Sequence, residues 1–172
     1  MRRIAALAAL LVLAACDGGG EPAARPAQPA PATPPAGTSI PADAGCVADV
    51  PVRVLPEWAR VGFSDATPRM PYVLGSRGDI AAIIFGYPLH QPPLPDRNNK
   101  ILWVSRVPLE SGSPLVIEAR LGGAGEVTRH EVTGGPGPSS IDLPAAGCWH
   151  LDLTWSGHTD SMRLTYRPSR SW

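Results

Sequence analysis

The sequence predicts an all-β fold, an antiparallel two-sheet sandwich that is immunoglobulin-like in architecture only. Short runs rich in Val, Ile, Leu and Trp recur at intervals of about ten residues beyond position 50, and clusters of Gly and Pro separate them. The chain holds 21 prolines and 18 glycines, which interrupt helices but fit turns and sheet edges. No apolar pattern with a long helical period is present, so we expect strands almost throughout the globular part.

The apolar runs give the positions of the expected strands. We place them at residues 50–55, 59–63, 80–85, 101–107, 115–121, 127–132, 140–143, 148–155 and 161–166. In the run 115–121, Leu115, Ile117 and Ala119 alternate with polar residues, as in a strand with one buried and one solvated face. Sheets of such strands pack through one face each, which is the arrangement of a sandwich.

The last two expected strands form a hairpin. A four-residue loop at 156–159 places Asp152 opposite Arg163 and His150 opposite Thr165 on the polar face. A slip of one residue would set Asp152 against Leu164 instead. The apolar residues then share the other face, with Trp149, Leu151, Leu153 and Trp155 opposite Tyr166, Leu164, Met162 and Asp160.

Residues 1–15 have the order of a secretory signal peptide. Arg2 and Arg3 precede an apolar stretch that is shorter than the roughly 20 residues needed to span a bilayer. The stretch ends in Leu13-Ala14-Ala15-Cys16, which resembles the lipobox of bacterial lipoproteins. The resemblance implies cleavage before Cys16, acylation of its thiol with chains such as palmitate, and anchoring in the cell membrane on its extracellular or periplasmic side. The alternative is an ordinary secretory signal with a chance cysteine.

Residues 16–45 form the lipidated N-terminus and a tether, and residues 46–172 form the domain. The tether is rich in Pro, Ala and Gly and has almost no large apolar residue, so it cannot bury enough surface to fold. Proline-rich chains favour an extended conformation of about 3.1 Å per residue, which makes a spacer. The domain has the length of one ordinary globular unit.

Two cysteines, Cys46 and Cys148, remain once Cys16 is acylated. Compartments outside the cytoplasm permit oxidation, so we expect a Cys46–Cys148 disulfide. The competing interpretation, a reactive or metal-binding pair, lacks a C-x-x-C spacing. An immunoglobulin domain proper places its core tryptophan shortly after the first cysteine, whereas Trp103 comes much later.

Two stretches resemble a known group of proteins. PSSIDLPAAGCW at 138–149 and NKILWV at 99–104 are similar to parts of uncharacterised lipoprotein domains from GC-rich bacteria, over most of residues 58–166. The resemblance implies a β-sandwich and supplies neither an activity nor a catalytic residue.

The balanced charge and the absence of known catalytic motifs limit the classes of function that the sequence supports. Basic and acidic residues number 15 each and no basic patch stands out, so a role on nucleic acid is poorly supported. The chain has no nucleophile elbow, phosphate-binding loop, zinc-protease motif or dinucleotide glycine pattern. We therefore predict no catalytic residue and no cofactor, and whether the domain is an enzyme stays open.

A doubled His-x-Asp pattern is the best candidate for a metal site. Strand alternation puts His150 and Asp152 on one face, beside the loop that carries His158, and Asp160 follows. Three such side chains suit zinc or copper. The competing interpretation is a solvated strand face on which Asp152 pairs with Arg163.

The loop 87–99 is the candidate contact for a ligand or partner, through Tyr87, His90 and Arg97. Loops of about this length are uncommon unless they are functional or disordered, and four prolines stiffen this one. The competing interpretation is an inert crossover between the two sheets.

Arg77-Gly78-Asp79 spells a cell-adhesion tripeptide. A three-residue match has a high false-positive risk, and a Gly-centred turn before the strand at 80–85 explains it.

Two functional hypotheses follow. In the first, a non-catalytic envelope lipoprotein uses its sandwich to contact an envelope protein or a glycan. In the second, His150, Asp152, His158 and Asp160 build a metal-binding or enzymatic domain. The absence of a nucleophile or cofactor motif favours the first.

Overall fold

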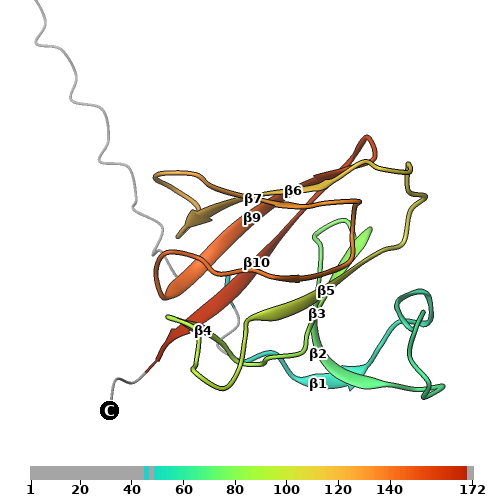
Figure 1. The fold of residues 1–172 in the computed structure, drawn as a ribbon, viewed down its shortest axis with the longest axis horizontal. Helices are drawn as coiled ribbons and strands as arrows, with labels where there is room; N and C mark the ends of the chain where they lie inside the picture. Colours follow the sequence, from blue (N-terminus) through green and yellow to red (C-terminus); the bar gives the residue numbers. More distant parts are fainter. Residues whose placement is uncertain (1–44, 47–48, 170–172) are drawn as a thin grey trace, which may run out of the picture. The chain divides into compact units, whose positions relative to one another are not determined.

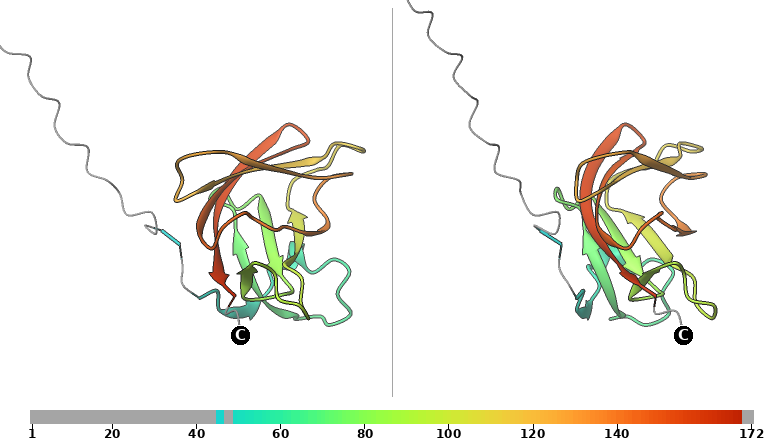
Figure 2. Two further views of the ribbon diagram at one scale, coloured as in Figure 1. Left: turned by 60° about the vertical axis from the view of Figure 1, so that its left-hand side comes forward. Right: turned by 90° about the vertical axis from the view of Figure 1, so that its left-hand side faces the viewer.

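Two packed β-sheets form the domain, as the sequence predicts (Figures 1 and 2). The computed structural model describes residues 45–46 and 49–169. Sheet I has the strand order β1-β2-β3-β5-β8, and sheet II has the order β4-β10-β9-β6-β7. The strands of sheet I are β1 (Val52–Val54), β2 (Arg69–Leu74), β3 (Ile80–Ile84), β5 (Lys100–Ser105) and β8 (Pro138–Ser140). Those of sheet II are β4 (Leu89–Gln91), β6 (Leu115–Leu121), β7 (Thr128–Val132), β9 (Gly147–Trp155) and β10 (His158–Pro168).

Neighbouring strands are antiparallel except β4 and β10, which run parallel. The predicted signal peptide, Cys16 and positions 16–44 of the predicted tether lie outside the described residues. The described residues include no helix that is long and apolar enough to cross a bilayer.

Most strands lie where we expect them, but β8 shares only Ser140 with the expected strand at 140–143, and two strands near prolines were not expected. β6 coincides with the expected strand at 115–121. β2 has Pro71 inside it, and β4 has Pro88 and Pro92 on either side, so neither was expected. The expected strand at 59–63 is wrong, because a 3-10 helix, η1 (Glu57–Ala59), follows Pro56 there and a turn continues to Phe63.

The β9–β10 hairpin has a tighter turn than predicted. Trp155 pairs with His158, so the loop is the dipeptide Ser156-Gly157 and the predicted register is wrong by two residues. Both turn residues have positive φ, 45° for Ser156 and 76° for Gly157, which suits the twist of a two-residue hairpin. Ser156 is held from outside, because its N–H donates to the Ser113 hydroxyl and its own hydroxyl accepts from the Glu110 N–H.

The shift of two residues keeps every side chain on its predicted face but changes its neighbours. Asp152 lies opposite Ser161 rather than Arg163, and Arg163 lies opposite His150.

The main core fills the space between the sheets. Trp103 and Trp155 are among its largest fully buried side chains, and each ring N–H has a partner: Ser139 Oγ at 3.0 Å and Ser105 Oγ at 2.9 Å. Tyr166 is buried too, and its hydroxyl donates to the Ile141 carbonyl at 2.8 Å. Burial, with a smaller contribution from the negative charge of Asp142, raises the pKa of Tyr166 far above its usual value. The core therefore holds its polar aromatic groups in satisfied, uncharged form.

A second apolar cluster covers the outer face of sheet I. Ala81, Ile83 and Tyr72 point away from sheet II and pack with Leu55 and Ala59 from the connection between β1 and β2. Trp58, Phe63, Met70, Leu102 and Val104 complete the cluster as half-buried side chains. β3 is thus buried on both faces, which accounts for its continuous apolar sequence Ile-Ala-Ala-Ile-Ile.

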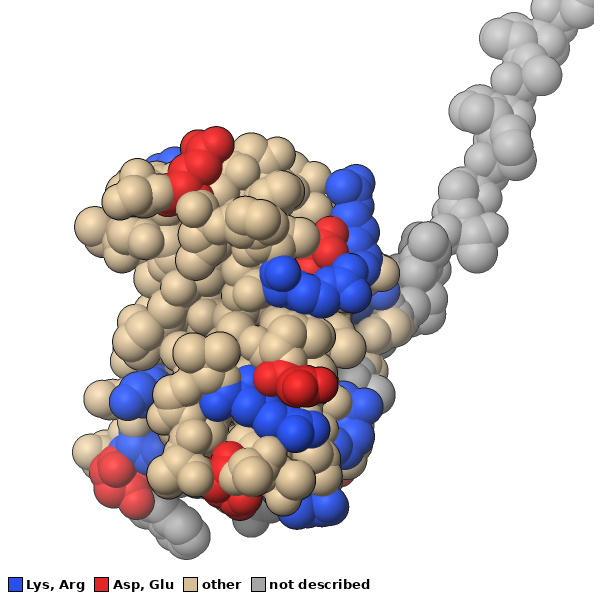
Figure 3. All heavy atoms as spheres, turned by 90° about the vertical axis from the view of Figure 1, so that its right-hand side faces the viewer, with Lys and Arg blue, Asp and Glu red and all other residues tan. Residues whose placement is uncertain are grey.

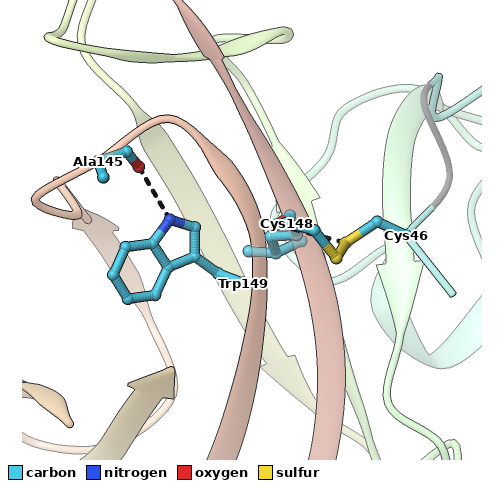
Figure 4. The surroundings of a disulfide bond; sticks show 5 residues. Cys46, Ala145, Cys148 and Trp149 are labelled. Atoms are coloured by element: carbon cyan, nitrogen blue, oxygen red, sulfur yellow. Dashed lines mark hydrogen bonds between the residues drawn. A yellow bond between two sulfur atoms is a disulfide. The ribbon is translucent and has the colours of Figure 1, made fainter. Parts of the chain in front are cut away.

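The disulfide joins the start of the domain to sheet II. Cys46 is bonded to Cys148 on β9, as predicted, with 5.8 Å between their Cα atoms. Cys148 and Trp149 point to opposite sides of β9, so the disulfide lies on the outer face while the Trp149 ring faces inward and donates to the Ala145 carbonyl (Figure 4). Arg167 forms an ion pair with Asp49, and the Tyr87 hydroxyl accepts from the Val50 N–H at 2.7 Å. These contacts fix the described residues that precede β1, 45–46 and 49–50, along the β10 side of sheet II. We call them the leading residues.

Candidate functional site

His150 and Asp152 lie together on the outer face of sheet II, as predicted. The His150 Nε2 is 3.1 Å from Asp152 Oδ1, and the other carboxylate oxygen accepts from the Arg120 guanidinium at 2.7 Å. Arg120 also approaches Glu118 at 3.7 Å. The Asp152 carboxylate is therefore occupied by a cation of the neighbouring strand, β6.

His158 and Asp160 lie on the opposite face of the hairpin. They pair with Trp155 and Leu153, whose side chains point into the core. The predicted four-residue constellation is thus not assembled, because strand alternation separates His150 and Asp152 from His158 and Asp160. Within residues 45–46 and 49–169, no group of three or more His, Cys, Asp or Glu side chains is arranged to hold a metal ion.

Asp160 is a buried carboxylate that organises the turn between β2 and β3. It accepts from the backbone N–H groups of Arg77, Asp79 and Ser161, at 2.9, 3.1 and 2.8 Å, and from the Ser76 hydroxyl at 3.2 Å. Burial raises the pKa of Asp160, but these four hydrogen bonds outweigh that penalty and hold the pKa below its usual value. Gly75 allows the close approach, because a Cβ at this position would collide with the Asp160 carboxylate.

The same contacts explain the Arg77-Gly78-Asp79 tripeptide as a turn. The Gly78 N–H donates to the Gly75 carbonyl at 2.8 Å, and the Asp79 carboxylate pairs with Arg106 at 2.9 Å. Asp79 is therefore held against the domain by a neighbouring arginine, while Arg77 is exposed.

The segment 87–99 is the crossover between the two sheets. It contains β4, and Asn99 holds it in place by accepting from the His90 N–H and donating to the His90 carbonyl, both at 2.8 Å. Arg97 donates to the Tyr87 carbonyl at 3.2 Å, and the Tyr87 hydroxyl contacts the leading residues Asp49 and Val50. Tyr87 and Arg97 bond within the domain through their side chains, whereas His90 does so through its backbone, and its ring Nδ1 has no partner among the described residues. These contacts fit a crossover that is fixed to the domain, and the ligand contact at Tyr87, His90 and Arg97 stays a prediction.

A polar groove runs along the outer side of β10. It consists of two adjoining hollows of about 350 and 230 Å³, and Ser76 and Ser161 line both. The rest of the larger hollow is lined by Arg77, Asp152, Leu153, Thr154, Thr159 and Asp160. The rest of the smaller one is lined by Gly45, Val73, Leu74, His150, Met162 and Arg163, so its walls are partly apolar. We call this feature the β10 groove.

Three parts of the chain build the β10 groove. Thr159, Ser161 and Arg163 form one row on β10, since alternate residues share a face, and His150, Asp152 and Thr154 form the facing row on β9. The wall comes from sheet I, where the Ser76 N–H donates to the Ser161 carbonyl at 2.7 Å and the two hydroxyls lie 2.8 Å apart. Hydrogen bonds from Ser76, Arg77 and Asp79 to the Asp160 carboxylate hold this wall against β10.

The two arginines of the β10 groove, Arg77 from the turn between β2 and β3 and Arg163 from β10, differ from the arginines of β6 and β7. Arg120 and Arg129 each have a carboxylate neighbour, whereas in the described part of the chain no carboxylate lies within 4.0 Å of Arg77 or Arg163. Over the face drawn in Figure 3, acidic and basic side chains alternate without a large field of one sign.

The β10 groove has hydrogen-bonding groups but no assembled nucleophile. Among the described residues, neither the Ser76 nor the Ser161 hydroxyl lies within hydrogen-bond distance of a histidine ring. The groove can bind a polar ligand through hydroxyl, guanidinium and imidazole groups. Sequence reasoning missed it, because Ser76 and Ser161 are 85 residues apart and no local pattern connects them.

No protein-family model, curated protein or solved structure matches this chain.

Proposed function

We propose that this chain is a membrane-anchored lipoprotein, held outside the cytoplasmic membrane by lipid on Cys16, whose β-sandwich is a non-catalytic binding or structural domain. Its partner is an envelope glycan or an envelope protein. The proposal joins the lipobox at residues 13–16 with the architecture of the domain.

The observation that carries the proposal is the Cys46–Cys148 disulfide. Structural disulfides persist in oxidising compartments and are rare in the cytosol. This one encloses most of the domain, since its cysteines are 102 residues apart, and it lies next to the predicted tether. A domain closed in this way at its membrane-proximal end suits a protein that works outside the cytoplasm.

The character of the outer surface supports a binding role over catalysis. Asp160, the most strongly bonded carboxylate described, serves a turn, and the His150–Asp152 pair is occupied by Arg120. The β10 groove offers hydrogen-bond donors and acceptors without a nucleophile and base in contact. The two His-x-Asp pairs lie on opposite faces of the hairpin, which favours the first hypothesis over a metal or enzymatic site built on them.

Metabolic labelling with an alkyne fatty acid tests the anchor. Wild-type protein and the Cys46→Ser/Cys148→Ser variant should both incorporate the label, because both retain Cys16. Cys16→Ser should incorporate no fatty-acid label and should no longer be recovered in the detergent extract of the membranes. Label on Cys16→Ser, or none on the wild type, would refute the proposal.

A further inference from the structure

We propose that the β10 groove binds an anionic glycan, a short run of sugar or polyol units that carry carboxylate or phosphate groups. This inference rests on the proposed function and deepens it, since it names the ligand class and the surface.

Arg77 and Arg163 flank the groove. Each is exposed and, as stated above, has no carboxylate neighbour among the described residues. Guanidinium groups bind carboxylate and phosphate with two parallel hydrogen bonds, which makes arginine suited to such anions. Two carboxylates line the groove. The half-exposed Asp152 is already neutralised by Arg120 and bonded to His150, whereas the buried Asp160 has only backbone N–H groups and the Ser76 hydroxyl as partners. The two guanidinium groups therefore exceed the one carboxylate that lacks a cationic partner, and the groove carries a surplus of positive charge.

Both arginines are held by the fold. The Arg77 N–H is bonded to the buried Asp160 carboxylate, which fixes its backbone. The Arg163 guanidinium lies against Gly45, where a larger residue would collide with it, and Gly45 adjoins the disulfide-bonded Cys46. A ligand thus meets two cations whose surroundings are already ordered, which reduces the entropy cost of binding.

Hydroxyl groups fill the interval between the arginines. Thr154 and Thr159 face each other across the hairpin, and their side chains have no hydrogen-bond partner in the described part of the chain. Ser76 and Ser161 share one hydrogen bond and keep further capacity as acceptors. Such a surface matches a ligand rich in hydroxyls. At roughly 3.3 Å per residue, Thr159 and Arg163 lie about 13 Å apart along β10, which is more than a single small anion needs.

The volume and shape also fit a short oligomer. The two hollows, about 350 and 230 Å³, adjoin at Ser76 and Ser161, which line both. Small-molecule sites usually measure about 300–1,000 Å³. No Phe, Tyr or Trp side chain lines either hollow among the residues described, so recognition depends on hydrogen bonds and charge rather than on stacking against a large aromatic ring.

Isothermal titration calorimetry tests the proposal on the native lipoprotein, extracted in a non-ionic detergent. The probes are a glucuronate-containing oligosaccharide, a glycerol phosphate oligomer and a neutral glucose oligosaccharide of similar length. We expect one or both anionic probes to bind at least about tenfold more tightly than the neutral one, and affinity to fall as salt rises. The probe that binds better identifies whether carboxylate or phosphate is the preferred group.

Variants locate the site. Arg77→Gln and Arg163→Gln should each weaken binding about tenfold, because each removes a charge-assisted contact. Arg129→Gln is the matched control, an exposed arginine on the same sheet but outside the groove, and it should bind like the wild type. Equal loss in Arg129→Gln, equal binding of the neutral probe, or no binding of either anionic probe would overturn the inference.

The mass of the same preparation separates this inference from the proposed function. A lipidated chain that binds no anionic probe refutes the groove inference and leaves the anchored lipoprotein intact. An unlipidated chain whose binding depends on Arg77 and Arg163 refutes the anchor and supports the groove.

Discussion

The outer faces of the two sheets differ in what covers them. On sheet I, the connection between β1 and β2 packs Leu55 and Ala59 onto Ile83 and Tyr72, so the outer face belongs to a second apolar cluster. On sheet II, the outer face is solvated, and Glu118, Arg120, His150 and Asp152 form a chain of polar contacts. The strand sequences record this difference, because β3 is apolar throughout while β6 alternates.

The two outer faces therefore have different roles. Covering one outer face stabilises the domain, and leaving the other open provides room for the β10 groove. The exception on sheet II is Cys148, which is buried on the outer face where the leading residues cross it. The four predictions below test how much each face contributes.

Loss of the disulfide should have the largest effect. Replacing both Cys46 and Cys148 by serine should lower the free energy of unfolding by about 4 kcal/mol, because the unfolded chain regains the freedom of a 102-residue loop. Urea denaturation measures the change. Reductant should destabilise the wild type to a similar extent and leave the double variant unchanged. A double variant as stable as the oxidised wild type would mean that the leading residues do not hold sheet II.

Ile83→Ala tests the covered face of sheet I. Ile83 is fully buried in the second cluster, so truncation should cost about 2–5 kcal/mol through lost burial and a cavity. Thr154→Ala, on the open face of sheet II, should change stability by no more than about 0.5 kcal/mol. Similar urea midpoints for the two variants would contradict the difference between the faces.

Asp160→Asn tests the support beneath the β10 groove. The substitution places an amide against three N–H donors and should cost about 1–3 kcal/mol at neutral pH. The pKa of Asp160 is lower in the folded than in the unfolded state, so its contribution is present above the unfolded pKa and is lost as pH falls through the folded one.

The acid limb of the stability curve checks the sign of this effect. From pH 7 downward through the range where carboxyl groups titrate, the wild type should lose more stability than Asp160→Asn, and the two should converge. An Asp160→Asn variant that keeps the full pH dependence of the wild type would show that the carboxylate is not the group responsible.

Asp152→Asn should have the smallest effect. Its ion pair with Arg120 is half exposed, with side-chain accessibilities of 49% and 28%, and exposed pairs contribute about 0–1 kcal/mol. Thermal unfolding at low and high salt should therefore separate the variant only slightly from the wild type. A loss as large as that of Ile83→Ala would place a structural role on the open face.

The alternation of apolar and polar residues, and the number of cysteines left to pair, allowed much of the fold to be predicted. Ile117 and Ala119 set the inner face of β6, and the two cysteines left after Cys16 gave the disulfide. The hairpin register was not determined by the same patterns, since a shift of two residues leaves both faces unchanged. Ser156-Gly157 did carry a turn signal, but the contacts that hold Ser156 come from the distant turn at 110–113 and are not evident in the local pattern.

Long-range packing limited the rest of the prediction. The segment 59–63 was predicted as a strand, yet Phe63 and the neighbouring Trp58 pack onto the outer face of a sheet that is not evident in the local sequence. Long-range packing limited the prediction of the candidate site as well. His150 and Asp152 were placed on one face correctly, whereas Ser76 reaches β10 from the other sheet through tertiary contacts alone.

The most direct test of the central claim is the intact mass of the native protein extracted from membranes, measured with and without reductant. The account predicts a chain that begins at an acylated Cys16 and gains about two hydrogen masses on reduction, as expected for one disulfide in an exported lipoprotein. A mass without lipid, unchanged by reductant, would contradict both the anchor and the disulfide-closed domain.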